Sequence, residues 1–577
     1  MLALKAEALV DSYKIGMSQL HEREVGGKTV KIKKSYSNFT ARKNAYMNFS
    51  QHSDGKIIVY GIAHAFQFVI DVWDETFFKM PKEEVIRRTA VRTMKHFGSI
   101  EEHMLFLRHL SDLHDLGYLP IEVRAIDEGT RYEIGLPLFT TTNTVDYFGW
   151  LVNYIETIVS GLVWPMTNTA TKIDQFYQQA KYYGQLSSPQ DAYANWLPIS
   201  VHEFGMRGYW GPEAAIRTSS AHSLFFMGSD TIAVMDFFEQ YYQHPIETSE
   251  PAASSVRASE HADVSRLLSE FRYCNPDVPD DIAEEFVMRE LIETSHGIMS
   301  YVSDTENYFR TLRVFARRNM SAILDRKDSP SGLPAKFVFR PDSSLKTPLT
   351  VICGYRVLLN VDDEHINPTD YTFVKPDECI KLNGVYYTEH NGEIIQLSED
   401  EVKGSLKILW ETFGGEEVDT EAGKMKLINP KVGLIYGEAI SQSHQEEIYQ
   451  RMIADGFSVT NLVIGKGSYA SLENNTRDLF SMSYKQTFSI AEIDGEDVCL
   501  EQQKTPMGDV SKRSAKGLLR VELTEDGYVL HQEQTLEQSL TGELKPLVEN
   551  GKYVGNVSLT NIQTRVRTGY NVIEQAV

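Results

Sequence analysis

Leu224-Phe225-Phe226-Met227-Gly228-Ser229-Asp230 begins as an apolar run and ends at a carboxylate, and an amphipathic run from Ile232 to Tyr241 follows it. The apolar run predicts a short buried strand, and the segment after it predicts a helix. The same unit recurs along the chain, with further strands predicted at Ile298–Val302, Phe337–Phe339, Val432–Tyr436 and Leu462–Ile464. Alternation of short strands with helices indicates an α/β fold with a parallel sheet or a barrel.

Charged residues stand where these apolar runs stop, namely Asp230, Asp304, Arg340, Asp342 and Glu438. One aspartate after a strand is usually only the N-cap of the next helix. The carboxyl ends of parallel strands, however, meet at one edge of a sheet, and that edge carries the active site in βα barrels and open α/β sheets. Charged groups at successive strand ends therefore indicate a site at this edge.

Composition limits the classes of protein. The 577 residues, 42% of them hydrophobic, can bury a large core in more than one domain, or in a barrel with insertions. A net charge of −23 argues against a nucleic-acid-binding surface. The four cysteines form no CxxC pair, which favours a reducing compartment over a zinc site or a disulfide framework. Met1–Val10 is too short and charged for a signal peptide, and no apolar run approaches the ~20 residues of a membrane span, so we expect a cytoplasmic protein without membrane contact.

The flanking segments follow other patterns. Helical spacing dominates from residue 60 to 117, and strands are predicted at Ile121–Ile126 and Leu138–Thr142. Trp150–Ile158 predicts an apolar helix that stops near Gly161 and Pro165. After Arg477 the chain becomes strand-rich and hydrophilic.

An insertion interrupts the strand–helix repeat at about residues 345–400. It contains Asn383-Gly384 and Asn391-Gly392, each between short β-rich runs. Asn-Gly is the strongest short-range signal for a hairpin turn. We expect a small β-rich insertion on one loop of the barrel.

Several residues suit an aromatic base and a phosphorylated sugar. Phe204 offers a flat face to an aromatic ring. The ionised Asp230 side chain can only accept hydrogen bonds, which suits the N–H donors of a carboxamide. Gly465-Lys466-Gly467-Ser468 is a weak phosphate signal, because many loops contain such glycines. Asp304, Asp342 and Glu438 suit sugar hydroxyls or a hydrated Mg²⁺.

His261 follows Glu260 in a Ser/Ala-rich loop. A lone histidine is more often a packed or surface residue than a catalyst. With a carboxylate such as Asp304 to orient its ring, however, a neutral imidazole is a competent nucleophile towards a phosphoryl group.

Longer motifs run in order through nearly the whole chain: Asp11-Ser12-Tyr13-Lys14, Val59-Tyr60-Gly61, Leu119-Pro120-Ile121-Glu122-Val123, His202 to Gly208, Gly228-Ser229-Asp230-Thr231, Glu260-His261, Val302-Ser303-Asp304, Arg340-Pro341-Asp342-Ser343 and Thr476-Arg477-Asp478. On these motifs the chain resembles the nicotinamide phosphoribosyltransferase family, part of the type II phosphoribosyltransferases. The insertion and the Glu438-Ala439 pair, where the family usually has Asp-Gly, mark it as a divergent member.

The resemblance implies a fold and a reaction. The fold would be an incomplete βα barrel (residues 161–479) beside an α+β domain built from both chain ends (1–160 with 480–577). The reaction would join nicotinamide and phosphoribosyl pyrophosphate to give nicotinamide mononucleotide and pyrophosphate. ATP would act as co-substrate through a phosphohistidine, with Mg²⁺ held through phosphates, waters and Asp342, in a homodimer with shared active sites.

The resemblance also implies roles for individual residues. Catalysis would involve His261, Glu260, Asp304 and Asp342. The nicotinamide site would be Tyr13 from the other subunit, Phe204, Arg207, Asp230, Ser300 and Arg340. Ribose and phosphates would be held by Arg42, Asp342, Gly437, Glu438, Gly467, Arg477, Ser483, Lys485, Lys504 and Lys512.

Three alternatives remain open. The nearest is nicotinate phosphoribosyltransferase, although an ionised Asp230 would repel the nicotinate carboxylate while accepting an amide proton. A catalytically silent relative that acts as a binding protein is the second. The third is a quinolinate-type barrel enzyme without ATP coupling.

Overall fold

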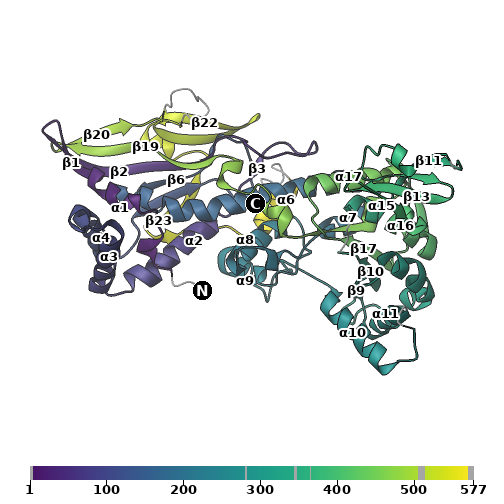
Figure 1. Ribbon diagram of the computed structural model, residues 1–577. Coiled ribbons are helices and arrows are strands. Elements are labelled where there is room, and N and C mark those ends of the chain that lie inside the picture. Colours follow the sequence, from purple (N-terminus) through teal and green to yellow (C-terminus); the bar gives the residue numbers. More distant parts are fainter. Residues whose placement is uncertain (1–3, 280–281, 343–346, 364, 505–513, 569–577) are drawn as a thin grey trace.

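The computed structural model describes residues 4–279, 282–342, 347–363, 365–504 and 514–568. Figure 1 shows an elongated molecule with a large sheet at the left and a strand–helix barrel at the right. Helix α6 (Glu156–Ser187) runs between the two parts. Each part has its own large cluster of buried hydrophobic side chains.

The left-hand sheet is woven from the two ends of the chain. Its strands lie in the order β20-β19-β2-β6-β4-β23-β24, with β1 paired to β2. They span Glu22–Val25 (β1), Lys28–Ala41 (β2), Ile121–Ala125 (β4), Pro137–Asn143 (β6), Met482–Ile493 (β19), Glu496–Glu501 (β20), Lys545–Glu549 (β23) and Lys552–Tyr553 (β24). Because β2 pairs with β6 on one edge and with β19 on the other, the predicted α+β domain of both chain ends is confirmed.

Amphipathic helices cover this sheet and account for its hydrophobic core. They are α1 (Tyr13–Met17), α2 (Ile62–Trp73), α3 (Lys82–Phe97), α4 (Met104–Leu116) and α5 (Gly149–Tyr154). The apolar face predicted between residues 60 and 117 is buried in α2 and α4, where Phe66, Val69 and Leu110 are fully buried.

The right-hand sheet is parallel and curled. Its order is β7-β18-β17-β10-β9-β8, with β7 at Val201–Glu203, β8 at Arg257–Ala258, β9 at Ile298–Val302, β10 at Lys336–Arg340, β17 at Val432–Tyr436 and β18 at Leu462–Lys466. Two isolated bridges, Glu203 to Ser229 and Gly228 to Ser254, carry the pairing from β7 back towards the segment that contains β8. The sheet therefore curls into a βα half-barrel whose closing members are single bridges, which confirms the predicted incomplete barrel.

Helices surround the barrel strands: α8 (Pro212–Ser223), α9 (Val234–Tyr241), α10 (His261–Cys274), α11 (Ala283–Thr294), α15 (Pro348–Cys353), α16 (Glu399–Phe413), α17 (Gln442–Ala454) and α18 (Ser468–Leu472). None of the helices in the described ranges combines the length and the apolar composition that crossing a membrane would require.

The strand predicted at Leu224–Phe226 is wrong. These residues form the turn that ends α8, and the sheet pairing falls two residues later, at Gly228 and Ser229. All three side chains are buried in the barrel core. A short apolar run satisfies a buried helix end as well as a buried strand, so periodicity alone could not separate the two.

The helix predicted to stop near Gly161 and Pro165 does not stop there. After α5 ends at Tyr154, α6 continues through Pro165 to Ser187. An interior proline costs a backbone hydrogen bond and strains the preceding turn. Burial of one long face of α6, including Met166, Ile173 and Phe176, outweighs that cost.

Between β10 and β17 lies a four-stranded sheet in the order β11-β12-β13-β14. It spans Arg356–Val361, Glu378–Leu382, Val385–His390 and Glu393–Leu397. Asn383 and Gly384 have positive φ values of 50° and 82°, and Asn391 and Gly392 have 52° and 83°. Two positive φ values in succession are typical of the turn that Asn-Gly favours, so the predicted hairpins are present.

The buried carboxyl group of Glu128 should make the stability of the fold depend on pH. Its carboxylate accepts a hydrogen bond from the Ala63 amide, 2.6 Å away at the start of α2. Burial raises the pKa of Glu128 to about 7, against the opposing effect of the amides. Because the folded-state pKa is raised, the stabilisation is full below about pH 4.5 and is lost as pH rises through 7.

We therefore expect the Glu128→Gln variant to have a flatter stability profile than the native protein between pH 5 and 8. The difference in unfolding free energy should change by about 3 kcal/mol across this range. Denaturant titrations of both proteins at several pH values would measure it. Parallel profiles would show that Glu128 does not titrate with the fold.

Candidate active site

His261 lies at the start of α10 with a carboxylate on each side of its ring. Its Nε2 is 3.0 Å from Asp304 Oδ1, and its Nδ1 is 3.5 Å from Asp342 Oδ1. Asp304 follows β9 and Asp342 follows β10, and these parallel strands place Val302 opposite Arg340. The Asp342 amide donates to Asp304 Oδ2 at 2.8 Å, which fixes the two carboxylates relative to each other. This arrangement orients the imidazole and leaves it half-buried.

The same three side chains offer a set of metal-binding atoms. One ligand atom each from His261, Asp304 and Asp342 lies within 4.8 Å of the others. Carboxylate oxygens suit Mg²⁺, whereas imidazole suits softer ions. The carboxylates therefore fit a hydrated Mg²⁺, and His261 fits a role other than that of a Mg²⁺ ligand.

The Phe204 ring packs against two glycines, each at or near the end of a strand. A Cβ added at Gly437 would come 2.2 Å from Phe204 Cζ, and one added at Gly465 would come 2.3 Å from it. Gly437 directly follows β17, and Gly465 lies near the end of β18. The ring therefore rests on bare backbone, because a side chain at either position would displace it.

Asp230 has a partner that the sequence did not reveal. His202 Nε2 lies 2.9 Å from Asp230 Oδ1, and Ser255 Oγ donates to the same oxygen. Burial acts to raise the pKa of Asp230, but these two hydrogen bonds outweigh it and hold the pKa below its usual value. The ring centres of His202 and Phe204 are 6.1 Å apart. Asp230 is therefore an ionised acceptor beside an aromatic face.

Other predicted residues lie around this rim. Arg207 is almost fully exposed, 3.5 Å from Glu260, and Arg340 donates to the Ser259 carbonyl. Ser300 is buried within β9, opposite Val338 of β10. Gly467 follows β18 as the residue before α18.

The turn after Gly437 departs from the family pattern in a visible way. Ala439 adopts a positive φ of 49°, a conformation that glycine adopts without strain. The Tyr436 hydroxyl reaches Glu438 Oε2 at 3.4 Å. The turn therefore holds alanine in a conformation that favours glycine.

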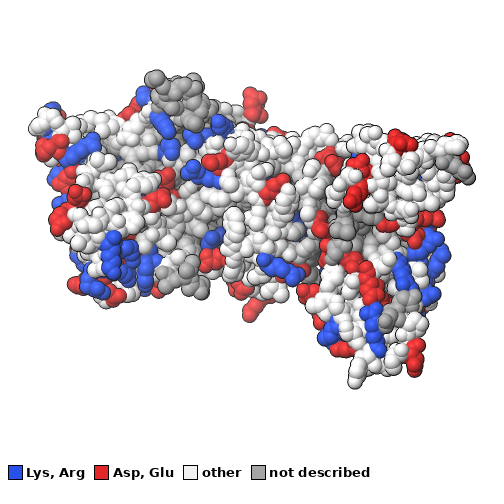
Figure 2. Space-filling view, in the orientation of Figure 1, with Lys and Arg blue, Asp and Glu red and all other residues white. Residues whose placement is uncertain are grey.

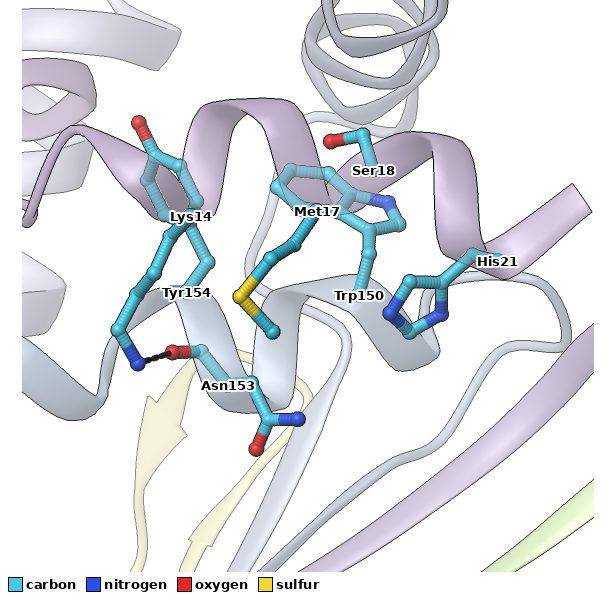
Figure 3. Close-up of a pocket in the computed structure, with 7 residues that line it drawn as sticks. All are labelled: Lys14, Met17, Ser18, His21, Trp150, Asn153 and Tyr154. Carbon is cyan, nitrogen blue, oxygen red and sulfur yellow. Dashed lines mark hydrogen bonds between the residues drawn. The ribbon is translucent and has the colours of Figure 1, made fainter.

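Tyr13 belongs to the other part of the molecule. It opens α1, and its side chain is 61% exposed. The next residue, Lys14, reaches back to α5, where its Nζ donates to the Asn153 carbonyl at 2.7 Å (Figure 3) and also pairs with Glu156. Lys14 anchors α1 while Tyr13 remains free to meet another surface.

Predicted phosphate-binding cations gather near Tyr13. Burial, together with the positive charges of Arg42, Lys504 and Arg477, holds the pKa of Lys485 below its usual value, although Glu156 opposes this. Arg42 Nε donates to the Ser481 carbonyl, and Ser483 pairs with Thr40 across β19 and β2. Lys512 lies outside the described residues.

The predicted site residues thus form two groups. One group occupies the barrel strand ends at the right of Figure 1, and the other occupies α1, β2 and β19 at the left. Figure 2 shows Lys and Arg side chains near the top of the left-hand part, and both acidic and basic side chains on the barrel. A single chain keeps Tyr13 apart from Phe204.

Several known proteins are similar to this chain over most of its length. The chain is 33% identical over 535 residues to a nicotinamide phosphoribosyltransferase of Acinetobacter baylyi, and the match covers 92% of each chain. It is 24% identical to the enzymes of that name from Xanthomonas campestris (78% of this chain, 80% of the relative) and Mycoplasma pneumoniae (74% and 77%). The solved nicotinate-nucleotide pyrophosphorylase from Pyrococcus furiosus aligns at 14% identity with a TM-score of 0.46, over 97% of this chain and 94% of that one. No protein-family model matches.

The glycine support of Phe204 yields a prediction. In Gly465→Ala, the new methyl group would come 2.3 Å from Phe204 Cζ and 2.7 Å from the Gly437 Cα, so the backbone must shift. We expect a loss of about 1–3 kcal/mol of unfolding free energy, measured by denaturant titration. Gly161→Ala, where nothing lies within 4 Å, is the control and should not be destabilised. Equal stability of the two variants would contradict the packing of Phe204 described above.

Proposed function

The chain belongs to the nicotinamide phosphoribosyltransferase family, and from that premise we propose that it transfers the phosphoribosyl group of phosphoribosyl pyrophosphate to nicotinamide. The products are nicotinamide mononucleotide and pyrophosphate, a step of NAD salvage. The ring nitrogen forms the new bond to the anomeric carbon as the bond to pyrophosphate breaks. The enzyme is thus a pentosyltransferase.

The observation that carries the choice of base is the position of the Asp230 carboxylate at the barrel rim, held there by hydrogen bonds from His202 and Ser255. Its carboxylate accepts from His202 and Ser255, and a further lone pair is available to the amide of nicotinamide. Nicotinate would bring a second negative charge to the same place, which the Asp230 carboxylate would repel. Phe204 would stack on the pyridine ring, with Tyr13 on its other face.

Charge development explains the remaining groups. Positive charge grows on the ribose as pyrophosphate leaves, as in other glycosyl transfers, and Asp342 is the carboxylate proposed to face the ribose. Arg42, Arg477, Lys485, Lys504 and Lys512 would hold the phosphates through charge-assisted hydrogen bonds. Mg²⁺, held near Asp342 through phosphates and waters, would neutralise part of the charge on the pyrophosphate.

We propose a homodimer, which the separation of the two groups of residues supports. If the left-hand sheet of the partner subunit met this chain's barrel, the partner's cations and the partner's Tyr13 would complete the site. A two-fold axis would then form two such sites, one at each barrel. A catalytically active monomer in sedimentation experiments would contradict this arrangement. The four free cysteines support a cytoplasmic location.

ATP coupling is proposed through His261. The oriented imidazole would attack the γ-phosphate of ATP, forming an N–P bond and releasing ADP, and water would later cleave that bond. Asp304 would stabilise the charged ring. The half-buried position of His261 between two carboxylates supports this role.

The base preference is tested by mixing the protein with phosphoribosyl pyrophosphate, Mg²⁺ and either base, and by quantifying the mononucleotides. We expect the native enzyme to prefer nicotinamide, and Asp230→Asn to lose at least tenfold of that preference, about 1.4 kcal/mol, because the repulsion of nicotinate disappears. Equal use of both bases by the native enzyme would contradict the role of Asp230. No product from either base would favour a silent relative.

The coupling is tested with ATP labelled in the γ-phosphate. We expect an acid-labile label on the native protein and none on His261→Ala, which should retain only the ATP-independent rate. His244→Ala is a control, since His244 contacts the Glu250 carbonyl outside the candidate site. Label on His261→Ala equal to that on the native protein would exclude this histidine.

A further inference from the structure

Glu203 is a buried carboxylate between two residues of the candidate site. It is the last residue of β7, next to His202 and Phe204, and its exposed fraction is 0%. Its Oε1 accepts from the Gly205 amide at 2.8 Å and from the Tyr209 hydroxyl at 3.4 Å. Its Oε2 accepts from three hydroxyl groups at 2.8–3.0 Å, those of Ser219, Ser229 and Thr231. Five donors therefore converge on one carboxylate.

The donors come from the two loops that carry Phe204 and Asp230 and from α8. Gly205 and Tyr209 flank the stretch that holds Arg207, and Ser229 and Thr231 stand on either side of Asp230. The Asp230 amide also donates to the Glu203 carbonyl at 2.9 Å. Ser219 ties these segments to α8. The carboxylate of Glu203 thus links the separate loops that carry Phe204 and Asp230, through hydrogen bonds to the neighbouring residues Gly205, Ser229 and Thr231.

Lys466 supplies the opposing charge. It stands opposite Glu203 in the parallel pairing of β18 with β7, and its exposed fraction is also 0%. Its Nζ donates to Ser471 Oγ at 2.8 Å, and the Tyr209 hydroxyl interacts with both Ser471 and Glu203. Burial lowers the pKa of Lys466, and the charge of Glu203 acts against that shift. Glu203 and Lys466 are therefore linked by a short polar chain through Tyr209 and Ser471.

Close packing leaves little freedom around this network. A Cβ at Gly205 would meet Glu203 Oε1, the Ser468 amide and the Tyr209 hydroxyl, each at 2.9 Å, and one at Gly208 would meet Ser468 Oγ at 2.2 Å. The stretch from Phe204 to Tyr209 is therefore held against the start of α18. Replacing a buried carboxylate with many donors is destabilising, because each buried donor left without an acceptor costs about 1–3 kcal/mol of folding free energy.

We propose that Glu203 is a positioning residue for the base: its carboxylate sets the distance between the aromatic face of Phe204 and the acceptor Asp230. This inference rests on the proposed function, because nicotinamide is the ligand that would bridge the two. Glu203 touches no substrate in this scheme. Its substitution should therefore weaken binding of the base more than binding of phosphoribosyl pyrophosphate.

The test is the Glu203→Gln variant, which keeps the shape but turns an amide NH₂ towards the donors. We expect the KM for nicotinamide to rise about tenfold, the equivalent of one hydrogen bond to a charged group. The KM for phosphoribosyl pyrophosphate and kcat should change by less than about twofold. Glu128→Gln is the matched control, a buried glutamate remote from the barrel rim, and should leave both KM values unchanged.

A second variant separates positioning from stability. Glu203→Gln with Lys466→Met removes both buried charges, so we expect its melting temperature to recover relative to Glu203→Gln alone. Its KM for nicotinamide should stay raised, because the link between Phe204 and Asp230 is still missing. Recovery of that KM together with stability, or a parallel rise of both KM values, would overturn the positioning role. Absence of product from the native enzyme would instead overturn the proposed function.

Discussion

The parallel register of β9 against β10 is the constraint on which the candidate active site depends. Val302 stands opposite Arg340, and the Ser303 amide donates to the Arg340 carbonyl at 3.0 Å. Two residues beyond each strand, Asp304 and Asp342 therefore reach the same level and meet His261. A slip of one residue would turn alternate side chains to the opposite face of the sheet. The relative placement of these side chains is thus determined by the backbone hydrogen bonds that pair the two strands.

The two parts of the molecule carry clusters of opposite charge among the predicted site residues. The barrel rim gathers carboxylates around His261, whereas the sheet of the two chain ends carries clustered cations at Lys485 and its neighbours. A chain with a net charge of −23 repels anions over most of its surface. The polyanionic substrate proposed above would therefore need a local cluster of cations, and a cluster built away from the carboxylates would keep each set from neutralising the other before that substrate binds.

Much of this architecture was predictable, for identifiable reasons. The strands at β9, β10, β17 and β18 are short apolar runs that stop at charged or glycine residues, and the Asn-Gly turns have a conformation that few other pairs adopt. The end of α8 was not predictable, because Leu224–Phe226 is equally apolar in a strand or a buried helix end. Pro165 in α6 was misjudged, because tertiary burial overrode local propensity.

The candidate site shows the same limit. Strand ends predicted that Asp304 would lie near His261, but neither His202 as the partner of Asp230 nor the five donors to Glu203 follows from spacing along the chain. These contacts join loops brought together only by the curl of the sheet. The sequence did show two of the donors to Glu203, since the polar residues Ser229 and Thr231 flank Asp230. Polar residues in a loop usually face solvent, however, so these two did not indicate a buried partner.

The weaving of both chain ends into one sheet has a consequence for synthesis on the ribosome. Strand β2 is made early and can pair with β6, but its other edge waits for β19, which begins at Met482. At a usual translation rate of about 5–20 residues per second, that edge stays open for tens of seconds. Open edges invite pairing with other nascent chains, and lysines are a common safeguard. Lys31, Lys33 and Lys34 on β2 are placed to protect the growing chain until its last segment emerges.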